Sequence, residues 1–441
     1  MVKLVFHGGA GEIGGNKILL IDRDTRILLD FGMNFAERSK FFSTPWLEPR
    51  DEKGFLEFGL LPRIEGTYHF DEGPAQVDAV FLSHSHTDHT ACLPFLKREI
   101  PVFCGETTAL LLQAFNETTA GRKFERYADG FKFTTFRTGS KIRIKGVEVE
   151  PIHVDHSVPG AYGFIIHTSE GAVLYSGDFR IHGARGDLTG DFVDIAAKSK
   201  PIAMICEGTN LTEGEVSTEQ EVQVKIGRVV NATSKLVLAD FRSADVDRIR
   251  TFHQAARESR RKLAISLKQA YILDKLRADK NLELPDLNSP DFLIFQREKK
   301  RYYNWESAIV DRYQNVVDAA RIGELQSKVV LSTTFSDFNE MLDIKPKPGS
   351  SFIFSTSEPF NEELEIRHDR YVNWLDHFGL PMYHIHCSGH IMPNEARHVV
   401  AKVAPKKFFP IHTENPRLFG RFVSDLAQVE LPEKGGIYEL P

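Results

Sequence analysis

Three histidines and an aspartate lie within residues 84–89 (HSHTDH), directly after the apolar run 79–82. Zinc in proteins is bound by imidazole nitrogen and carboxylate oxygen, and a tightly turned loop with this spacing can supply ligands to two adjacent ions. A polar loop with surface histidines is the alternative, and for a single histidine it would be the better explanation. The H-x-H-x-D-H spacing instead favours a metal site with these ligands: His84, His86, Asp88 and His89.

Later parts of the chain supply the further ligands that a two-metal site needs. His156, Asp178 and His412 lie in the segments VDHSVPG, SGDFR and FPIHTE. Each of them alone is explained equally well by a structural role. Together with the loop at 84–89 they complete a binuclear site, in which two ions about 3.5–4 Å apart can activate water and neutralise charge on a phosphate.

The elements that position these residues are short apolar runs, each followed at once by polar residues. Such runs, closed by glycine or polar turns, are typical of buried strands. We expect the histidines and carboxylates at these strand ends to meet along one edge of a sheet. The runs are residues 79–82, 172–175, 202–206, 382–386 and 408–411.

The HSHTDH loop, the later histidine and the Gly177–Asp178 step resemble the metallo-β-lactamase superfamily. The resemblance implies an α/β fold of the αββα sandwich type. It also implies two zinc ions per chain, with manganese as the alternative because the site mixes nitrogen with carboxylate oxygen. The family pattern makes Asp178 a bridge between the ions and assigns His84, His86 and His156 to one ion and Asp88, His89 and His412 to the other.

Three further positions narrow the resemblance to the β-CASP nucleases. Glu207 matches the acidic residue of that family, His390 the first added histidine and His412 the second. Segment 236–249 resembles the β-CASP cap, and the glycine-rich opening at 8–16 resembles the start of the ribonuclease J group. In that family a histidine at the last position accompanies the RNA-cutting members, so the resemblance favours RNA over DNA.

The middle of the chain has a different residue pattern from the rest, because its apolar residues recur with helical periodicity and it carries many charged residues. We expect residues 208–380 to form an inserted α/β β-CASP cap domain, and residues 1–207 and 381–441 to form the metallo-β-lactamase domain and its completion. The chain ends soon after His412, without the C-terminal domain of long bacterial ribonuclease J proteins, and therefore resembles a short, archaeal-type ribonuclease J. Residues 36–75 are loop-like, and the resemblance does not explain them.

The expected chemistry is hydrolysis of a phosphodiester by water that the metal pair activates. Asp88 is expected to orient this water as well as to bind metal. We expect His390 to donate a hydrogen bond or a proton at the phosphate or the leaving oxygen, and Glu207 to hold His390 in the required orientation and tautomer. A buried structural pair of Glu207 and His390 is the alternative.

Ser355, Thr356 and Ser357 follow an apolar run and could hold a phosphate of the nucleic acid through hydroxyl and backbone N–H groups. The resemblance to ribonuclease J makes this a pocket for a 5′-monophosphate, and a plain turn is the alternative. Basic runs at 260–262 and 297–303 either contact the RNA backbone or are solvated helix faces. No Gly-Lys-Ser/Thr follows the opening glycines, so we expect a tight turn near the site rather than a phosphate loop.

Composition limits the partners and the compartment. The formal net charge is −6, so RNA has to be held by a local basic patch or by bound metal. The four cysteines form no C-x-x-C pair and no disulfide framework, which fits a reducing cytosol. Neither a signal peptide nor a membrane-spanning stretch is recognisable, which predicts a cytoplasmic protein with no membrane partner. A homodimer remains open.

The sequence therefore predicts a two-zinc ribonuclease that acts as a 5′-to-3′ exonuclease, with endonuclease activity left open. The alternatives are a metallo-β-lactamase-fold hydrolase of a small ester, lactam or thioester, and a DNA nuclease of the same family. A third alternative is a non-enzymatic RNA-binding subunit with a degenerate site. The presence of a ligand at every one of the seven metal positions argues against the third alternative.

Overall fold

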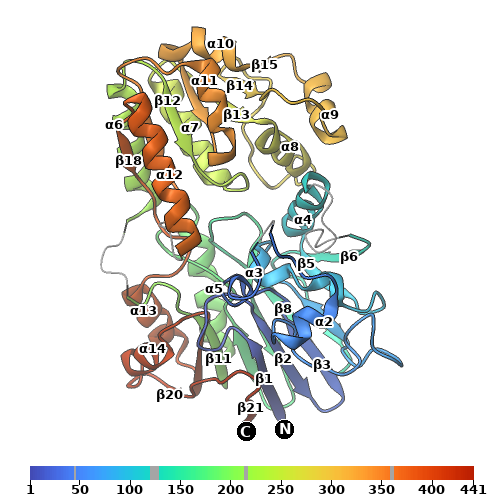
Figure 1. Ribbon diagram of the computed structural model, residues 1–441. Coiled ribbons are helices and arrows are strands. Elements are labelled where there is room, and N and C mark those ends of the chain that lie inside the picture. The colour runs from blue at the N-terminus through green and yellow to red at the C-terminus, as the bar shows by residue number, and fades with distance from the viewer. Residues whose placement is uncertain (44–45, 120–128, 213–216, 358–361) are drawn as a thin grey trace. The chain divides into compact units, whose positions relative to one another are not determined.

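The computed structural model describes residues 1–43, 46–119, 129–212, 217–357 and 362–441 (Figure 1). It divides into two compact units: unit 1 is Met1–Val216 with Gly389–Pro441, and unit 2 is Ser217–Ser388. Unit 2 is therefore an insertion in the chain of unit 1. The domain boundaries predicted from sequence, after residues 207 and 380, fall nine and eight residues before these divisions. No described helix is both long and apolar enough to cross a lipid bilayer.

The first sheet of unit 1 is mixed, with antiparallel pairing on one side of β3 and parallel pairing on the other. Both described termini contribute to it, because β21 pairs with β1. Across the sheet the strands are β21 (Ile437–Leu440), β1 (Val2–Gly8), β2 (Lys17–Asp22), β3 (Thr25–Leu29), β4 (Ala79–Phe81), β5 (Val102–Gly105) and β6 (Phe133–Phe136).

The second sheet of unit 1 is mixed in the same way. Strands β20 to β10 pair in parallel, and β10 to β7 pair antiparallel. Across the sheet the strands are β20 (Gln428–Val429), β19 (Lys407–Ile411), β11 (Ala203–Glu207), β10 (Ala172–Tyr175), β9 (Ala161–His167), β8 (Val147–Val154) and β7 (Ile142–Ile144).

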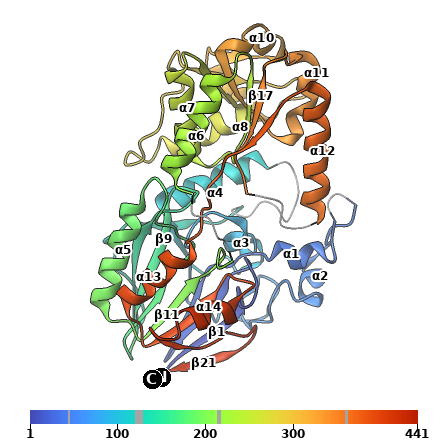
Figure 2. The ribbon, with the colours of Figure 1, turned by 90° about the vertical axis from the view of Figure 1, so that its left-hand side faces the viewer.

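The two sheets pack face to face, and a layer of helices covers each outer face. Side chains from β1 and β2 of the first sheet and from β10 and β19 of the second share one apolar core. Helices α2 and α4 and turn η1 pack on the outer face of the first sheet. Helices α5, α13 and α14 pack on that of the second, where α5 and α13 lie side by side (Figure 2). The helical elements of unit 1 are α1 (Phe35–Ser39), α2 (Glu52–Glu57), α3 (Thr87–Thr90), η1 (Leu93–Phe95), α4 (Glu106–Thr118), α5 (Gly186–Ser199), α13 (Pro393–Val403) and α14 (Pro416–Phe422).

Unit 1 is thus an αββα sandwich, which confirms the fold class predicted from the sequence. The layering explains why the central strands are continuous apolar runs rather than alternating ones. Every residue of β4, β10 and β11 is buried, because each strand has a helix layer on one face and the other sheet on the opposite face.

Unit 2 is an α/β unit built on a parallel sheet. Capping boxes at Thr218–Glu221 and Ser266–Gln269 start helices α6 and α8. Across the sheet the strands are β15 (Val316–Val317), β14 (Phe292–Phe295), β13 (Lys262–Ser266), β16 (Val329–Ser332), β12 (Val237–Asp240), β17 (Ser351–Phe354) and β18 (Met382–His384). The helical elements are α6 (Glu219–Ala232), α7 (Val246–Glu258), α8 (Leu267–Leu276), α9 (Asn304–Arg312), α10 (Ala319–Glu324), η2 (Gln326–Lys328), η3 (Phe335–Glu340), α11 (Met341–Ile344) and α12 (Glu362–Phe378).

One predicted strand belongs to a different sheet from the one expected. The apolar run at 382–386 begins with strand β18, but β18 pairs with β17 in unit 2 and not with the sandwich of unit 1. The other four runs become β4, β10, β11 and β19, all in unit 1. A short apolar run identifies a strand, but its partner is chosen by contacts far away in the sequence.

Candidate metal centre

The predicted ligands leave the sandwich at the ends of its strands. His84 and His86 lie in the loop after β4, and Asp88 and His89 lie in the single turn of helix α3 that follows. His156 comes after β8, Asp178 after β10 and His412 directly after β19. The structure brings all seven side chains into two adjoining groups: His84, His86 and His156 form one, and Asp88, His89, Asp178 and His412 form the other.

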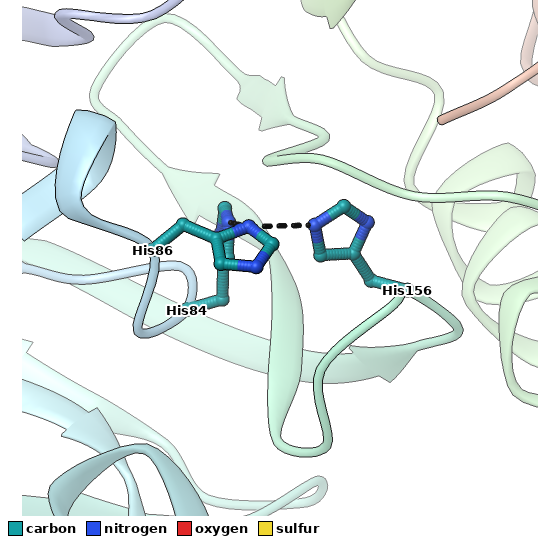
Figure 3. Close-up of side chains that lie close together, drawn as sticks. All are labelled: His84, His86 and His156. Carbon is teal, nitrogen blue, oxygen red and sulfur yellow. Dashed lines mark hydrogen bonds between the residues drawn. The ribbon is translucent and has the colours of Figure 1, made fainter. Parts of the chain in front are cut away.

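In the first group, three imidazole rings converge (Figure 3). Nδ1 of His86 lies 3.0 Å from Nε2 of His84 and 3.1 Å from Nε2 of His156. The three rings therefore place one nitrogen each close enough together to hold a single metal ion. Burial lowers the pKa of His84 and of His156 well below the ordinary value. Both rings are therefore neutral near pH 7 and offer lone pairs, as metal ligands must.

In the second group, two histidines face two carboxylates. Nε2 of His89 lies 3.1 Å from Oδ2 of Asp178, and Nε2 of His412 lies 3.2 Å from Oδ2 of Asp88. Oδ2 of Asp178 is also 3.7 Å from Nε2 of His84 in the first group. This carboxylate is therefore placed between the two groups, where a bridging ligand would be.

The donor atoms of this site fit a pair of divalent cations. Both carboxylate oxygens of Asp178 and Nε2 of His89 are buried, and apart from their mutual contact at 3.1 Å these atoms have no hydrogen-bond partner. Burial favours the protonated acid, but His412 and His89 outweigh it and hold the pKa of Asp178 well below its usual range. A buried ionised carboxylate with so few hydrogen bonds is costly unless cations compensate it. Metal binding would satisfy these atoms.

Comparisons with known proteins agree with this geometry. A family profile described as the β-lactamase superfamily domain matches residues 60–226. Ribonuclease J of Mycoplasma genitalium is 25% identical over 93% of this chain and 68% of its own length. Ribonuclease J of Thermus thermophilus is 24% identical over 94% of the chain and 68% of its own. The chain is a ribonuclease J-like protein with a metallo-β-lactamase domain.

A solved structure supports the fold over the whole length of this ribonuclease J-like chain. A protein of unknown function from Enterococcus faecalis V583 superposes with a TM-score of 0.77 and covers 99% of both chains. The sequence identity is 20%, so this likeness concerns the fold alone.

Asp30 is a residue of the metallo-β-lactamase domain that the sequence analysis missed. Its carboxylate accepts hydrogen bonds from the backbone N–H and the hydroxyl of Ser83, both at 2.7 Å, and from the Tyr175 hydroxyl at 2.5 Å. It also lies 2.7 Å from Nδ1 of His89. A carboxylate behind a ligating histidine fixes the ring and directs the other nitrogen at the metal. The available signal was its position directly after the apolar strand β3, the same signal that marked Asp178.

We expect Asp30→Asn to weaken zinc binding about 10–100-fold, because an amide cannot replace the carboxylate that orients His89. Zinc titration of the metal-free protein against a chromophoric chelator measures this change. Asp187→Asn is the matched control, since that carboxylate is exposed in α5 and pairs with Arg185. Equal zinc affinity of the Asp30 variant and the wild type would restrict Asp30 to a structural role.

Glu207 and His390 lie side by side, with Glu207 buried and His390 half-buried. Glu207 accepts hydrogen bonds from the backbone N–H groups of Phe179, Thr209 and Ile391 and from the Thr209 hydroxyl, at 3.4, 3.0, 3.1 and 2.9 Å. Its Oε1 lies 3.4 Å from Nδ1 of His390. Burial disfavours the charged ring, but Glu207 and Asp178 outweigh it and raise the pKa of His390 to about 9.

Glu207, His390 and His412 also lie close enough together to form a third group of candidate ligands. The four hydrogen bonds to Glu207 already satisfy both of its oxygens, so this group does not require a cation. The geometry instead supports a role of Glu207 in holding His390.

The glycine-rich opening makes the predicted tight turn beside the site. The carbonyl of Gly9 accepts the backbone N–H of His412 at 2.7 Å, and Asn16 donates its N–H to the Asp88 carbonyl at 3.2 Å. Gly14 has a φ of +77°, and a Cβ at this position would lie 2.9 Å from Cβ of Asp88. The turn therefore needs glycine to approach Asp88, and it braces two of the predicted ligands.

The three residues predicted to bind phosphate differ in exposure. Ser355 is buried in unit 2, where its hydroxyl donates to the Ile385 carbonyl at 2.7 Å and accepts from Arg248. Thr356 is half-buried and Ser357 is exposed. Their role in phosphate binding stays a prediction, and the accessible hydroxyl in this segment is that of Ser357.

Ser355→Ala is expected to lower the free energy of unfolding of unit 2 by about 1–3 kcal/mol, because it removes a hydrogen-bond acceptor of the buried Arg248. Ser357→Ala should leave the stability unchanged, since that side chain is exposed. Urea denaturation of both variants tests the difference, and equal stabilities would contradict the internal role of Ser355.

Proposed function

We propose that this chain is a two-zinc ribonuclease that hydrolyses phosphodiester bonds in RNA. The observation that carries the proposal is the gathering of seven candidate nitrogen and oxygen ligands in two adjoining groups, with the buried carboxylate of Asp178 3.1 Å from His89 in one group and 3.7 Å from His84 in the other. The similarity to ribonuclease J of several bacteria, at 24–26% identity over more than nine-tenths of the chain, supports RNA as the substrate.

The composition of the site supports zinc. The two groups contain five imidazoles and two carboxylates, and neutral imidazole with some carboxylate suits zinc better than magnesium or calcium. Manganese is the alternative ion. When bound, such a pair lowers the pKa of water towards neutrality and stabilises negative charge on the phosphate.

Three residues in and beside the metal groups have separate roles in the proposed reaction. Asp88 presents a carboxylate at the edge of the second group, where it orients the attacking water as well as binding metal. Glu207 and Asp178 raise the pKa of His390 to about 9 in the metal-free chain, which favours a protonated ring that can donate a proton to the leaving oxygen. Glu207 stabilises that charged form and holds the ring in place.

The direction of cutting is the finer part of the proposal. By resemblance to ribonuclease J, the enzyme works from the 5′ end towards the 3′ end and prefers a 5′-monophosphate. The exposed hydroxyl of Ser357 and the half-buried Thr356 are the groups through which segment 355–357 would contact that phosphate. Endonuclease action is the alternative mode.

A single experiment tests the proposal. The purified protein is incubated with 5′-labelled RNA and DNA of equal sequence, and the metal content of the same sample is measured. We expect RNA cleavage and about two zinc ions per chain, a pair as in other two-metal hydrolases. Cleavage of DNA alone would overturn the RNA assignment. A zinc-loaded protein that hydrolyses a lactam, ester or thioester but no nucleic acid would overturn the nuclease assignment.

A further inference from the structure

The hydroxyl of Thr209 lies where the metal groups and the proposed acid meet. Its Oγ1 is 2.9 Å from Oε2 of Glu207, 2.9 Å from Nδ1 of His412 and 3.2 Å from Nδ1 of His390. Nothing in the sequence marked this residue, which stands two positions after Glu207. It is the point through which three predicted site residues contact one another.

A hydroxyl has one hydrogen to donate and two lone pairs that accept. Two acceptors lie within reach of the Thr209 hydrogen, the Glu207 carboxylate at 2.9 Å and the His412 carbonyl at 3.3 Å, and the nearer carboxylate is the stronger acceptor. With the hydrogen directed to Glu207, Oγ1 accepts from Nδ1 of both histidines. This arrangement places a hydrogen on Nδ1 of each ring.

We propose that Thr209 is a positioning residue that fixes the tautomer of His412 and the orientation of His390 through one shared hydroxyl. The inference rests on the proposed function, because it concerns how two residues of that site are held. It goes beyond the proposed function because one hydroxyl would support both metal binding by His412 and proton donation by His390.

The consequence for His412 is that Nε2 is the nitrogen left to bind metal, because Thr209 holds a hydrogen on Nδ1. Nε2 lies 3.2 Å from Oδ2 of Asp88 in the second metal group, a contact in which it is the donor when no metal is bound. Without Thr209 the ring could also place its hydrogen on Nε2, where it would compete with a metal. Removing the hydrogen-bond partner of a metal-ligating histidine typically weakens metal affinity about 10–100-fold.

The consequence for His390 is a fixed ring orientation. Its Nδ1 faces Thr209 and Glu207, so Nε2 is the ring nitrogen that remains for a leaving oxygen. The Asn210 side chain donates to the His390 carbonyl at 2.9 Å and holds the backbone of the same residue. Residues 209 and 210 together therefore position both ends of His390.

The test uses Thr209→Val, which keeps the shape but removes the hydroxyl, and Thr209→Ser, which keeps the hydroxyl. Thr233→Val in unit 2 is the control for losing a buried threonine hydroxyl, since the Thr233 hydroxyl donates to the Val229 carbonyl and lies 2.9 Å from the Ser351 hydroxyl. Zinc titration of each metal-free protein is the first measurement and needs no RNA substrate. We expect one of the two zinc dissociation constants to rise about 10–100-fold in Thr209→Val and to return to the wild-type value in Thr209→Ser.

The second measurement is kcat on RNA at saturating zinc. We expect Thr209→Val to lower kcat about 10–10²-fold with little change in KM, because a misplaced acid acts on the chemical step. In a His390→Ala background this loss of kcat should disappear, whereas the loss of zinc affinity should remain because it acts through His412.

Three results would overturn the inference. These are a wild-type zinc affinity in Thr209→Val, an equal loss in Thr209→Ser, or a loss of the same size in Thr233→Val. If Thr209→Val does not fold, Thr209→Ala is compared with Thr209→Ser in the same way. Failure of the proposed function is a different result: the wild-type protein itself would lack zinc or leave RNA intact.

Discussion

His390→Ala is expected to retain both zinc ions and the affinity for RNA but to lower kcat about 10²–10⁴-fold, the typical contribution of one acid–base group. The reason is the position of the ring. It lies beside the metal groups, with Nδ1 held near Glu207 and Thr209, and its pKa of about 9 in the metal-free chain favours the charged ring. Single-turnover cleavage of 5′-labelled RNA, with elemental analysis of the same sample, measures the two effects separately.

The matched control for this variant is His182→Ala. His182 is also a buried histidine of unit 1 beside a carboxylate, with Nδ1 2.9 Å from Oε2 of Glu395, but it belongs to none of the three ligand groups. We expect that control to keep most of its turnover. A loss of zinc in His390→Ala would show that this histidine is a ligand, and the assignment of proton donation would then be wrong.

The sequence predicted the fold and the proximity of the site residues for the same physical reason. Strands that are buried on both faces must be apolar throughout, and the polar residues that follow must leave the sheet at its edge. Asp88, Asp178 and His412 are recognisable in this way, because each directly follows or closely follows such a run. Geometry then confirms that the seven predicted ligands lie together, while their binding of metal remains a proposal.

The sequence could not show which groups form hydrogen bonds with the ligands and hold them in place. Asp30 lies more than fifty positions before His89, and Thr209 lies about two hundred before His412. No local sequence pattern marks these carboxylate and hydroxyl groups, because the histidine that each one contacts lies in a segment that follows a different strand of the sandwich. Only the folded chain makes Asp30 and Thr209 recognisable as parts of the site.

Segment 355–357 shows that side chains adjacent in the sequence can have different environments. Three hydroxyl residues after an apolar run suggested one phosphate pocket, yet Ser355 points into unit 2 and contacts Arg248. Arg248 is itself buried and pairs with Glu219 at 2.8 Å, so the serine completes an internal network. A short polar segment cannot reveal which of its side chains point inward when strand β17 ends and the chain turns.

Asp178→Asn is expected to lose at least one of the two zinc ions and to reduce RNA cleavage about 10³-fold or more. Its position between the two groups makes this residue important to both, since Oδ2 is 3.1 Å from His89 and 3.7 Å from His84. An amide of the same shape offers one neutral oxygen in place of a charged carboxylate. Metal ions contribute several kcal/mol of charge stabilisation in the transition state, and about 1.4 kcal/mol corresponds to tenfold in rate.

Thermal unfolding provides a measurement of the same variant that does not depend on activity. Metal that binds only the folded chain stabilises it, by about 2.7 kcal/mol at a free concentration one hundred times the dissociation constant. Chelation should therefore lower the Tm of the wild-type protein clearly, and lower that of Asp178→Asn much less. Asp425→Asn, at an exposed carboxylate paired with Arg397, is the control and should respond to chelation as the wild type does. If chelation destabilises Asp178→Asn and the wild type equally, the buried carboxylate does not bridge the metal pair, and its small number of hydrogen bonds needs another explanation.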